Sequence, residues 1–207
     1  MASTPRVLVT GFEPFAEAKL NSSEVVLHWL EGQDLKDVTF SILPVEYDLS
    51  VERIISLIEE VDPKIIIALG QAEGRVKVSF ERVAVNLDDA RIADNAGEIR
   101  QDQPIDASGE AAFMATLPVR AVVEALNETG HPVEESLSAG AFVCNHLFYS
   151  VMNHLRDSKS GRWFDFVHLP LVPEQGDEFP GKPTLAKEAQ GEVIVDAIKK
   201  ARELWAT

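Results

Sequence analysis

Cysteine is nearly absent from this 207-residue chain, which carries only Cys144 and therefore cannot form an internal disulfide. Chains without disulfides are typical of reducing compartments, so the sequence predicts a cytoplasmic protein. Long apolar runs are missing too, since none approaches the ~20 residues that a membrane-spanning helix needs. The opening stretch MASTPRVLVTGFEPF lacks the basic start, long apolar core and cleavage site of a signal peptide. We therefore expect neither membrane association nor secretion.

Positive charge is scarce in this sequence. Lys and Arg total 19 against 34 Asp and Glu, which gives a formal net charge of −15. An acidic surface repels phosphate backbones, so we expect no nucleic-acid partner. The phosphate-binding patterns G-x-G-x-x-G and G-x-x-x-x-G-K-[ST] do not occur, and neither does H-E-x-x-H or a Cys/His cluster. The sequence therefore predicts no nucleotide cofactor and no metal site.

The composition that is present suits one domain. Hydrophobic residues make up 45% of the chain, which is enough for a core of ordinary size. No internal repeat, low-complexity tract or linker divides the sequence. We therefore expect a single domain over residues 1–207.

Short runs rich in β-branched residues alternate with helical patterns. We expect strands at 6–11, 38–45, 64–70, 137–144 and 164–172. We expect helices at 22–32, where serines can cap, and at 48–63, 108–130, 145–156 and 184–205. The run KIIIALG (64–70) is apolar without alternation, as in a parallel strand covered on both faces. This order predicts an α/β fold, a single-domain α/β/α sandwich with a mostly parallel, twisted central sheet.

The segment from 71 to 107 interrupts this rhythm. Apolar residues alternate up to Phe80 and resume out of phase at Val83, which predicts a bulge or bend near Glu81. A polar loop dense in Asp, Asn, Arg and Gly follows. Loops this long in a compact domain are more often functional or at an interface than idle, so we expect a role for this one.

The stretch SAGAFVCNHLFYSVMNHL (138–155) contains the only cysteine. If a strand ends and a helix begins there, the thiol of Cys144 lies at a helix amino terminus. Backbone N–H groups and the helix dipole at that position stabilise a thiolate and lower its pKa. The same N–H groups can hold a developing oxyanion. The alternative is that Cys144 is a small buried core residue.

A thiol nucleophile needs a histidine as its base, and His168 is the best placed of five. It ends the run WFDFVH just before LPLVPEQ, so we expect it at the carboxyl end of a strand, where the sites of open α/β sheets gather. His28 and His154 fall inside amphipathic helices, and His131 falls in a turn. His146 is close to Cys144 in sequence, but in the first helical turn it would point sideways. A structural role in the core is the alternative for His168.

A carboxylate should orient the imidazole of that histidine. Glu81 is one candidate, because it lies at the phase break of an otherwise apolar strand. Spacing alone does not choose between it and the other nearby carboxylates, which are Asp88, Asp89, Asp94 and Asp106.

Seven segments together resemble pyroglutamyl-peptidase I, also called pyrrolidone-carboxylate peptidase, a family of cytosolic cysteine peptidases that remove an N-terminal 5-oxoproline. The resemblance covers nearly the whole chain in order. Its segments are VLVTGFEPF (7–15), GQAEGR (70–75), ERVAVN (81–86), DARIADN (89–95), QPID (103–106), SAGAFVCN (138–145) and FVHLPLVPEQ (166–175).

The resemblance implies a role for each matching residue. Cys144 is similar to the family's nucleophile, His168 to its general base and acid, and Glu81 to the carboxylate that orients the histidine. Arg91, together with the backbone N–H of Cys144, would hold the oxyanion. The residues that match the lactam pocket are Phe12, Phe15, Gln71, Phe142 and Val143. The resemblance further implies a peptide substrate with an N-terminal pyroglutamate, no cofactor, and assembly as a homotetramer.

The sequence departs from the family pattern mainly at 16–23. Ala16 and Glu17 follow GFEPF where the family usually has glycines, and NSS stands in place of N-P-S. These differences do not touch the expected Cys-His-Glu triad. Two alternatives therefore stay open: a relative that hydrolyses another small lactam or amide, and a non-enzymatic binder of capped amino termini.

Overall fold

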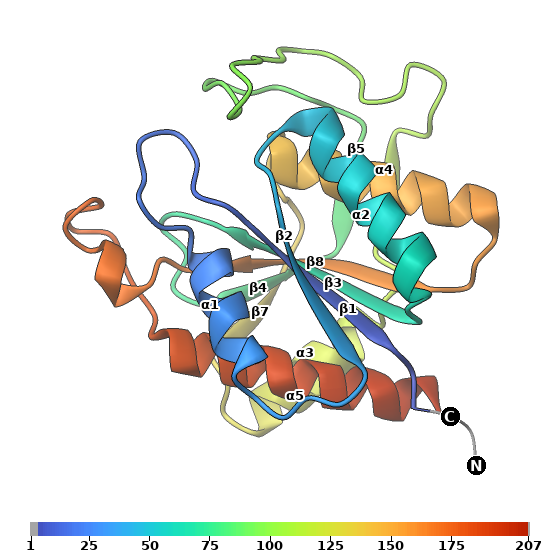
Figure 1. Cartoon of the computed structure of the whole chain (residues 1–207), viewed down its shortest axis with the longest axis vertical. Helices are drawn as coiled ribbons and strands as arrows, with labels where there is room; N and C mark the ends of the chain where they lie inside the picture. Colours follow the sequence, from blue (N-terminus) through green and yellow to red (C-terminus); the bar gives the residue numbers. More distant parts are fainter. Residues whose placement is uncertain (1–3, 207) are drawn as a thin grey trace.

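A six-stranded twisted sheet forms the centre of the protein, in the strand order β2-β1-β3-β8-β4-β7 (Figure 1). The computed structural model describes residues 4–206, with the side chain of Asp157 excepted. The strands of this sheet are β1 (Val7–Phe12), β2 (Val38–Leu43), β3 (Ile65–Gln71), β4 (Val78–Glu81), β7 (Val133–Ser136) and β8 (Trp163–Leu169). All neighbouring pairs are parallel except β4 with β8, so the predicted α/β fold with a mostly parallel sheet is confirmed.

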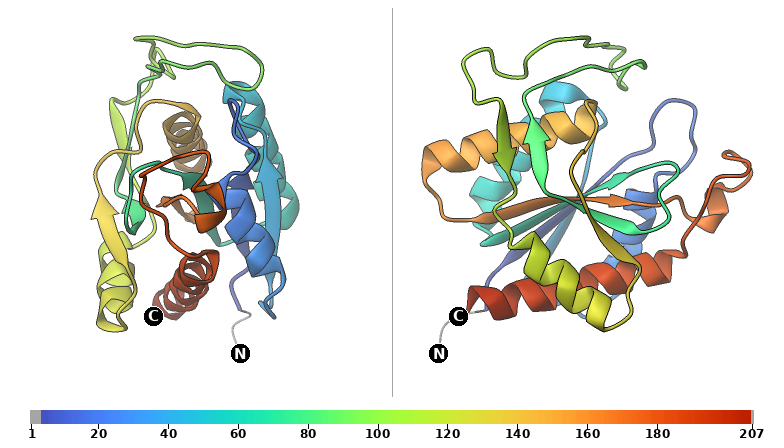
Figure 2. Two further views of the ribbon diagram at one scale, coloured as in Figure 1. Left: turned by 90° about the vertical axis from the view of Figure 1, so that its left-hand side faces the viewer. Right: turned by 180° about the vertical axis from the view of Figure 1, so that it is seen from behind.

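Five helices cover the two faces of the sheet. They are α1 (Ser22–Glu31), α2 (Tyr47–Val61), α3 (Val119–Glu128), α4 (Val143–Ser158) and α5 (Lys187–Trp205). Helices α2 and α4 lie on one face, and α1, α3 and α5 lie on the other (Figures 1 and 2). A short 3₁₀ helix, η1 (Pro173–Gln175), follows β8. None of the helices within residues 4–206 is both long enough and apolar enough to cross a membrane.

Burial on both faces explains why the start of β3 reads as an unbroken apolar run. Ile65, Ile66 and Ile67 are all fully buried, and they alternate between two hydrophobic clusters. Ile65 and Ile67 pack with α1, α3 and α5, whereas Ile66 packs with α2 and α4. Because successive side chains of a strand point to opposite faces, one strand contributes to both cores.

The antiparallel pair of β4 and β8 decides which side chains meet at the site. Ser79 stands opposite His168, and Phe80 stands opposite Val167. Since side chains alternate along a strand, Ser79 and Glu81 lie on the same face of the sheet as His168. The bend predicted near Glu81 is present, because β4 ends at Glu81 and a separate strand, β5 (Val83–Val85), begins two residues later.

Three local predictions were wrong. No strand covers 137–144; the edge strand is β7, and residues 137–142 are a loop that leads into α4. The predicted helix at 108–130 is a short strand, β6 (Ala112–Met114), followed by α3, whose N-cap is Pro118; the helix does not extend further back because the residue before a proline is disfavoured in a helical conformation. The N-cap of α1 is Asn21 and not one of the serines; the side chain of Asn21 accepts a bond from the Ser23 N–H.

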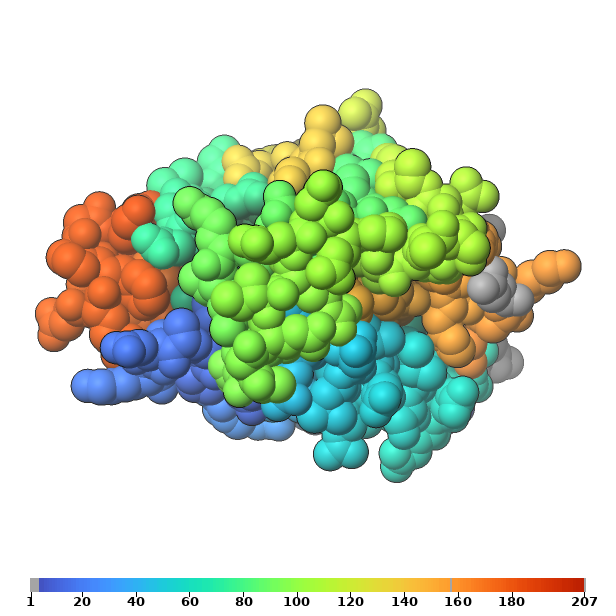
Figure 3. Space-filling model, turned by 90° about the horizontal axis from the view of Figure 1, so that it is seen from above, coloured from blue at the N-terminus to red at the C-terminus, as the bar shows by residue number. Residues whose placement is uncertain are grey.

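A long polar loop joins β5 to β6, which pair with each other outside the main sheet. Seen from above, this segment (green) lies across the top of the molecule beside α2 (Figure 3). Its backbone is fastened at several points: the Asp89 N–H donates to Ala141 at 2.9 Å, and the Asn95 N–H donates to Val45 at 2.9 Å. The loop is therefore held against segments that border the site described next.

Candidate active site

Cys144 lies in the first turn of α4. The helix begins at Val143, two residues earlier than the predicted start at 145, so Cys144 is its second residue. The N–H groups of the first turn have no carbonyl partner within a helix, and Phe142, the N-cap residue, supplies no side-chain bond to them. Cys144 is half-buried. The thiol and a set of free backbone donors thus come together at the amino terminus of α4.

The imidazole of His168 is held by Glu81. Nδ1 of His168 lies 2.8 Å from Oε1 of Glu81, and both residues are buried. With Nδ1 bonded to the carboxylate, Nε2 is the nitrogen available to a reacting group. A carboxylate in this position fixes the tautomer and stabilises the imidazolium when it forms.

Arg75 joins the carboxylate to the segment that precedes the cysteine. Its Nη2 donates to Oε1 of Glu81 at 3.1 Å and to Oγ of Ser136 at 3.2 Å. The same nitrogen lies 3.3 Å from the carbonyl oxygen of Ser138. The guanidinium therefore supplies a positive charge next to the buried Glu81 and links β4 to the loop that enters α4.

A cavity of about 180 Å³ lies beside the cysteine and the histidine. Cys144 and His168 line it directly, so the structure places the predicted nucleophile and the predicted base at one opening. All five residues predicted for the lactam pocket also line it: Phe12, Phe15, Gln71, Phe142 and Val143. Asn21, Val45 and residues 139–141 complete the wall.

Gly70 allows the close packing beneath the thiol. A Cβ placed on it would lie 2.7 Å from Cζ of Phe166 and 3.1 Å from Sγ of Cys144. The sequence suggested a tight turn at this glycine, but β3 continues through it to Gln71. The absent side chain is needed for the approach of Cys144 and Phe166, and no turn occurs there.

Gln71 presents hydrogen-bond donors at the cavity. Its Oε1 accepts bonds from the Ser22 N–H at 2.9 Å and from Nε2 of Gln175 at 2.7 Å. Because these two bonds fix the amide, the Nε2 hydrogens of Gln71 are left to donate to another partner. A ligand carbonyl in the cavity would be such a partner.

The pKa of the Cys144 thiol is raised, whereas the sequence predicted that the helix terminus would lower it. Burial and, to a smaller extent, the negative charge of Glu81 raise the pKa of Cys144 to about 12, although a bond from a backbone N–H opposes both effects. The lowering of this pKa expected from the helix terminus is thus outweighed. A raised pKa favours the neutral thiol, so Cys144 needs a base to become a nucleophile.

Arg91 differs from the other predicted site residues. It is exposed in the long loop and does not line the cavity. It is nevertheless close along the chain to the cavity wall, because Asp89, two residues earlier, donates its N–H to Ala141. The structure therefore brings the backbone of this loop to the site but leaves the guanidinium outside the cavity.

The remaining candidate carboxylates serve other partners. Asp88 lies 2.8 Å from Nδ1 of His146, and both residues are buried. Asp94 accepts bonds from the N–H groups of Tyr47, Ala96 and Glu98. Asp106 accepts from Ser108 and Asn153, and Asp89 is exposed. Among these carboxylates, the His168 bond is recorded for Glu81 alone.

Two residues of the site were missed from sequence. Arg75 stands in the quoted GQAEGR segment, but its bond to Glu81 depends on a contact between segments that sequence spacing does not reveal. Asn145 follows the cysteine and is buried, with bonds to both the N–H and the carbonyl of Val85. The position of an asparagine directly after the cysteine in the sequence is the signal that could have pointed to Asn145.

The described residues contain no group of three or more His, Cys, Asp or Glu side chains arranged to hold a metal ion. What they contain instead is a thiol, an imidazole bonded to a carboxylate, and free backbone donors around one cavity. This combination on an open α/β sheet is typical of a hydrolase that acts through a cysteine nucleophile.

Comparison with known proteins agrees with this class. The sequence profile of the family described as pyroglutamyl peptidase matches residues 5–204. The pyrrolidone-carboxylate peptidase of Cupriavidus taiwanensis is 43% identical over 187 residues, which cover 89% of this chain and 87% of that protein. Pyrrolidone-carboxylate peptidase 1 of Caldanaerobacter subterraneus is 39% identical over 195 residues, covering 94% and 96%.

Solved structures give the same result. A mutant pyrrolidone carboxyl peptidase of Pyrococcus furiosus superimposes with a TM-score of 0.90 at 35% identity, covering 97% of this chain and 99% of that one. Pyroglutamyl peptidase I of Bacillus amyloliquefaciens superimposes with a TM-score of 0.90 at 33% identity, covering 97% and 96%. The chain therefore belongs to the pyroglutamyl peptidase family of cysteine peptidases.

Proposed function

We propose that this protein hydrolyses the bond after an N-terminal pyroglutamyl residue of peptides, with Cys144 as nucleophile, His168 as general base and acid, and Glu81 as the orienting carboxylate. The observation that carries the proposal is the shared cavity of Cys144 and His168, with Glu81 bonded 2.8 Å from the far nitrogen of the histidine. Membership of the family supports the substrate.

The reaction begins from a neutral thiol, because burial raises the pKa of Cys144. Nε2 of His168 takes the thiol proton as the sulfur attacks the pyroglutamyl carbonyl. The resulting imidazolium is stabilised by Glu81, and it donates its proton to the leaving amine. Water activated by His168 then hydrolyses the thioester and releases pyroglutamate. No cofactor takes part in these steps.

The oxyanion is assigned to the backbone N–H of Cys144, in the uncapped first turn of α4. Arg91 is proposed as a second donor. The bond between Asp89 and Ala141 holds the long loop close to the cavity. A further movement of this loop toward the cavity would let the guanidinium of Arg91 reach the oxyanion.

The cavity suits a lactam ring. A pyroglutamyl group carries no ammonium, so its site needs apolar walls and a few donors and acceptors for the ring amide. Phe12, Phe15 and Phe142 supply apolar surface, and Gln71 supplies a donor. An ordinary amino terminus would lose hydration of its ammonium there, so the cavity discriminates against uncapped peptides.

The experiment compares pyroglutamyl, prolyl, alanyl and glutaminyl amide reporters, with and without iodoacetamide. Cleavage confined to the pyroglutamyl reporter and lost on alkylation is expected. Cleavage of another small lactam or amide in its place would favour the altered-substrate alternative, which the changed 16–23 loop keeps open. No cleavage of any reporter, together with slow alkylation of Cys144, would favour a binder of capped amino termini.

We further propose that the whole chain is one catalytic domain and that it works in the cytoplasm as a homotetramer. The family profile, which spans residues 5–204, supports the single domain. The tetramer and the compartment rest on family resemblance and on the single cysteine. Light scattering should give about four times the chain mass of 22.8 kDa, and a mass near 22.8 kDa would contradict the tetramer.

A further inference from the structure

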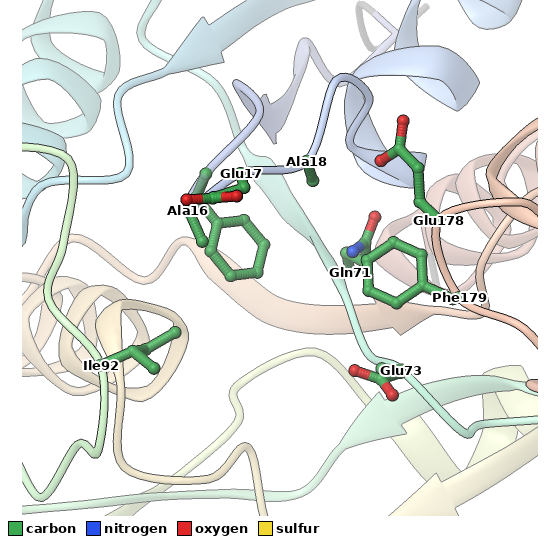
Figure 4. Close-up of a pocket in the computed structure, with 9 residues that line it drawn as sticks. Ala16, Glu17, Ala18, Gln71, Glu73, Ile92, Glu178 and Phe179 are labelled. Atoms are coloured by element: carbon green, nitrogen blue, oxygen red, sulfur yellow. The ribbon is translucent and has the colours of Figure 1, made fainter.

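A second, larger pocket adjoins the catalytic cavity. It has a volume of about 480 Å³ and shares Phe15 and Gln71 with the cavity that holds Cys144. Its other walls come from the 16–18 turn, the long loop and the segment after η1 (Figure 4). The scissile carbonyl lies at Cys144 under the proposed function, so the peptide beyond it needs space outside the 180 Å³ cavity. This adjoining pocket provides such space.

The pocket combines negative charge with apolar surface. Three glutamates line it, Glu17, Glu73 and Glu178, and no lysine or arginine is among its described lining residues. Figure 4 shows Ile92 and Phe179 on opposite sides of the pocket. Ile92 is 46% exposed, which is high for a large apolar side chain, so its surface is available to an aliphatic ligand. A long aliphatic side chain that ends in a cation matches both properties.

The three carboxylates are not equally available. Glu73 lies 2.9 Å from Nζ of Lys182, so its charge is already compensated. Among residues 4–206, the side chain of Glu178 accepts a bond from one neutral backbone donor, the N–H of Lys19 at 3.2 Å, and from no cation. Glu17 has no hydrogen-bond or ion-pair partner recorded among the described residues. Glu17 and Glu178 are therefore the carboxylates free to pair with an incoming cation.

We propose that this adjoining pocket binds the side chain of the residue that directly follows pyroglutamate, and that it selects lysine or arginine there. The inference rests on the proposed function and adds a substrate preference to it. The aliphatic stem packs between Ile92 and Phe179, and the charged end pairs with Glu17 and Glu178. The net charge of −15 favours the approach of cationic peptides in the same sense.

The test compares two peptides that differ only in the charge of one side chain, pyroglutamyl-lysyl-alanine amide and pyroglutamyl-norleucyl-alanine amide. Because exposed ion pairs are weak, we expect kcat/KM to be about 3- to 10-fold higher for the lysyl peptide. The ratio should fall toward one as salt is raised, since salt screens exposed charges. Equal values for the two peptides, or a preference for norleucine, would overturn the proposal.

Variants assign the preference to the pocket. Glu17→Gln and Glu178→Gln should each lower the lysyl-to-norleucyl ratio, and the double variant should bring it close to one. Glu59→Gln is the matched control, because Glu59 is exposed near the end of α2 that leads into the amino end of β3, away from the carboxyl strand ends that border the site. An unchanged ratio in the double variant would remove the pocket from the explanation.

Binding measurements keep this inference separate from the proposed reaction. The Cys144→Ala protein is titrated with both peptides by calorimetry, so the comparison does not depend on turnover. Tighter binding of the lysyl peptide supports the pocket, and equal binding overturns it. Failure of the unaltered protein to cleave either peptide would contradict the proposed function alone.

Discussion

Oε1 of Glu81 lies 2.8 Å from Nδ1 of His168, and both residues are buried on the face of the sheet that α4 covers. Glu81→Gln should lower kcat/KM about 10²- to 10⁴-fold, because the amide cannot stabilise the imidazolium and can favour the wrong tautomer. Steady-state hydrolysis of a pyroglutamyl reporter measures the loss. Glu134→Gln is the control, since Glu134 also contacts Arg75 but is not bonded to His168. Equal losses in the two variants would contradict the role of Glu81.

Arg75 is a positioning residue that acts through Glu81. Arg75→Gln should lower kcat about 10- to 100-fold with a smaller change in KM, since the guanidinium bonds Oε1 of Glu81 and does not line the cavity. Arg75→Lys should recover part of kcat, because it keeps the charge but loses the forked geometry by which Nη1 also reaches Ser79. A change confined to KM, with no rescue by lysine, would argue against positioning.

Asp165 makes stability depend on pH. Burial raises its pKa well above the usual value, the nearby charge of Glu81 raises it further, and Oδ2 has no recorded partner. A carboxyl with a raised folded-state pKa contributes stability below its unfolded pKa, and this contribution is lost as pH rises toward the folded pKa. Asp165→Asn cannot ionise, so it should be more stable than the unaltered protein at pH 7.

Urea unfolding at pH 4 and pH 7 checks this prediction. The stabilisation by Asp165→Asn should be larger at pH 7 than at pH 4. At pH 4 a larger fraction of the aspartate is protonated in both the folded and the unfolded protein, so the variant differs less from the unaltered chain. Asp177→Asn, at an exposed position, is the control and should show little difference between the two pH values. A gain that is larger at pH 4 would contradict the sign of the effect.

Ala16 adopts a left-handed backbone conformation, with φ of 53°. Because this region is unfavourable for residues with a Cβ, Ala16→Gly should raise the free energy of unfolding by on the order of 1 kcal/mol. Thermal and urea unfolding measure the change. Glu17→Gly, one residue further on and not among the positive-φ residues, is the comparison and should not stabilise. A loss of stability in Ala16→Gly would show that the turn does not persist in solution.

The pattern of apolar runs predicted most of the central sheet, because buried parallel strands such as β3 are unbroken in hydrophobicity. It failed at the edge. Strand β7 contains Glu134 and Glu135, and a half-exposed edge strand with charged side chains reads as a loop. The small residues at 138–142 then attracted a strand prediction that belongs to an irregular segment.

The site was predicted in part for similar reasons. Cys144 and His168, which line one cavity, could be proposed from sequence because each stands near the end of an element, which is a local property of the sequence. The choice of Glu81 among five carboxylates depended on family resemblance. Its contact with His168 arises from the antiparallel pairing of β4 with β8, which joins segments far apart in the sequence and cannot be read from residue spacing. The raised pKa of Cys144 and the outlying position of Arg91 depend on burial and loop placement, which sequence spacing does not encode.

The central claim is that Cys144 carries the pyroglutamyl group during the reaction. Mass spectrometry of the protein after rapid acid quench with a pyroglutamyl reporter tests it directly, and the single cysteine makes the assignment unambiguous. We predict an added pyroglutamyl mass on the peptide that contains Cys144, and none in Cys144→Ser or Cys144→Ala, both of which should fold normally and lose turnover. Product release by either variant, or an adduct on another residue, would contradict the claim.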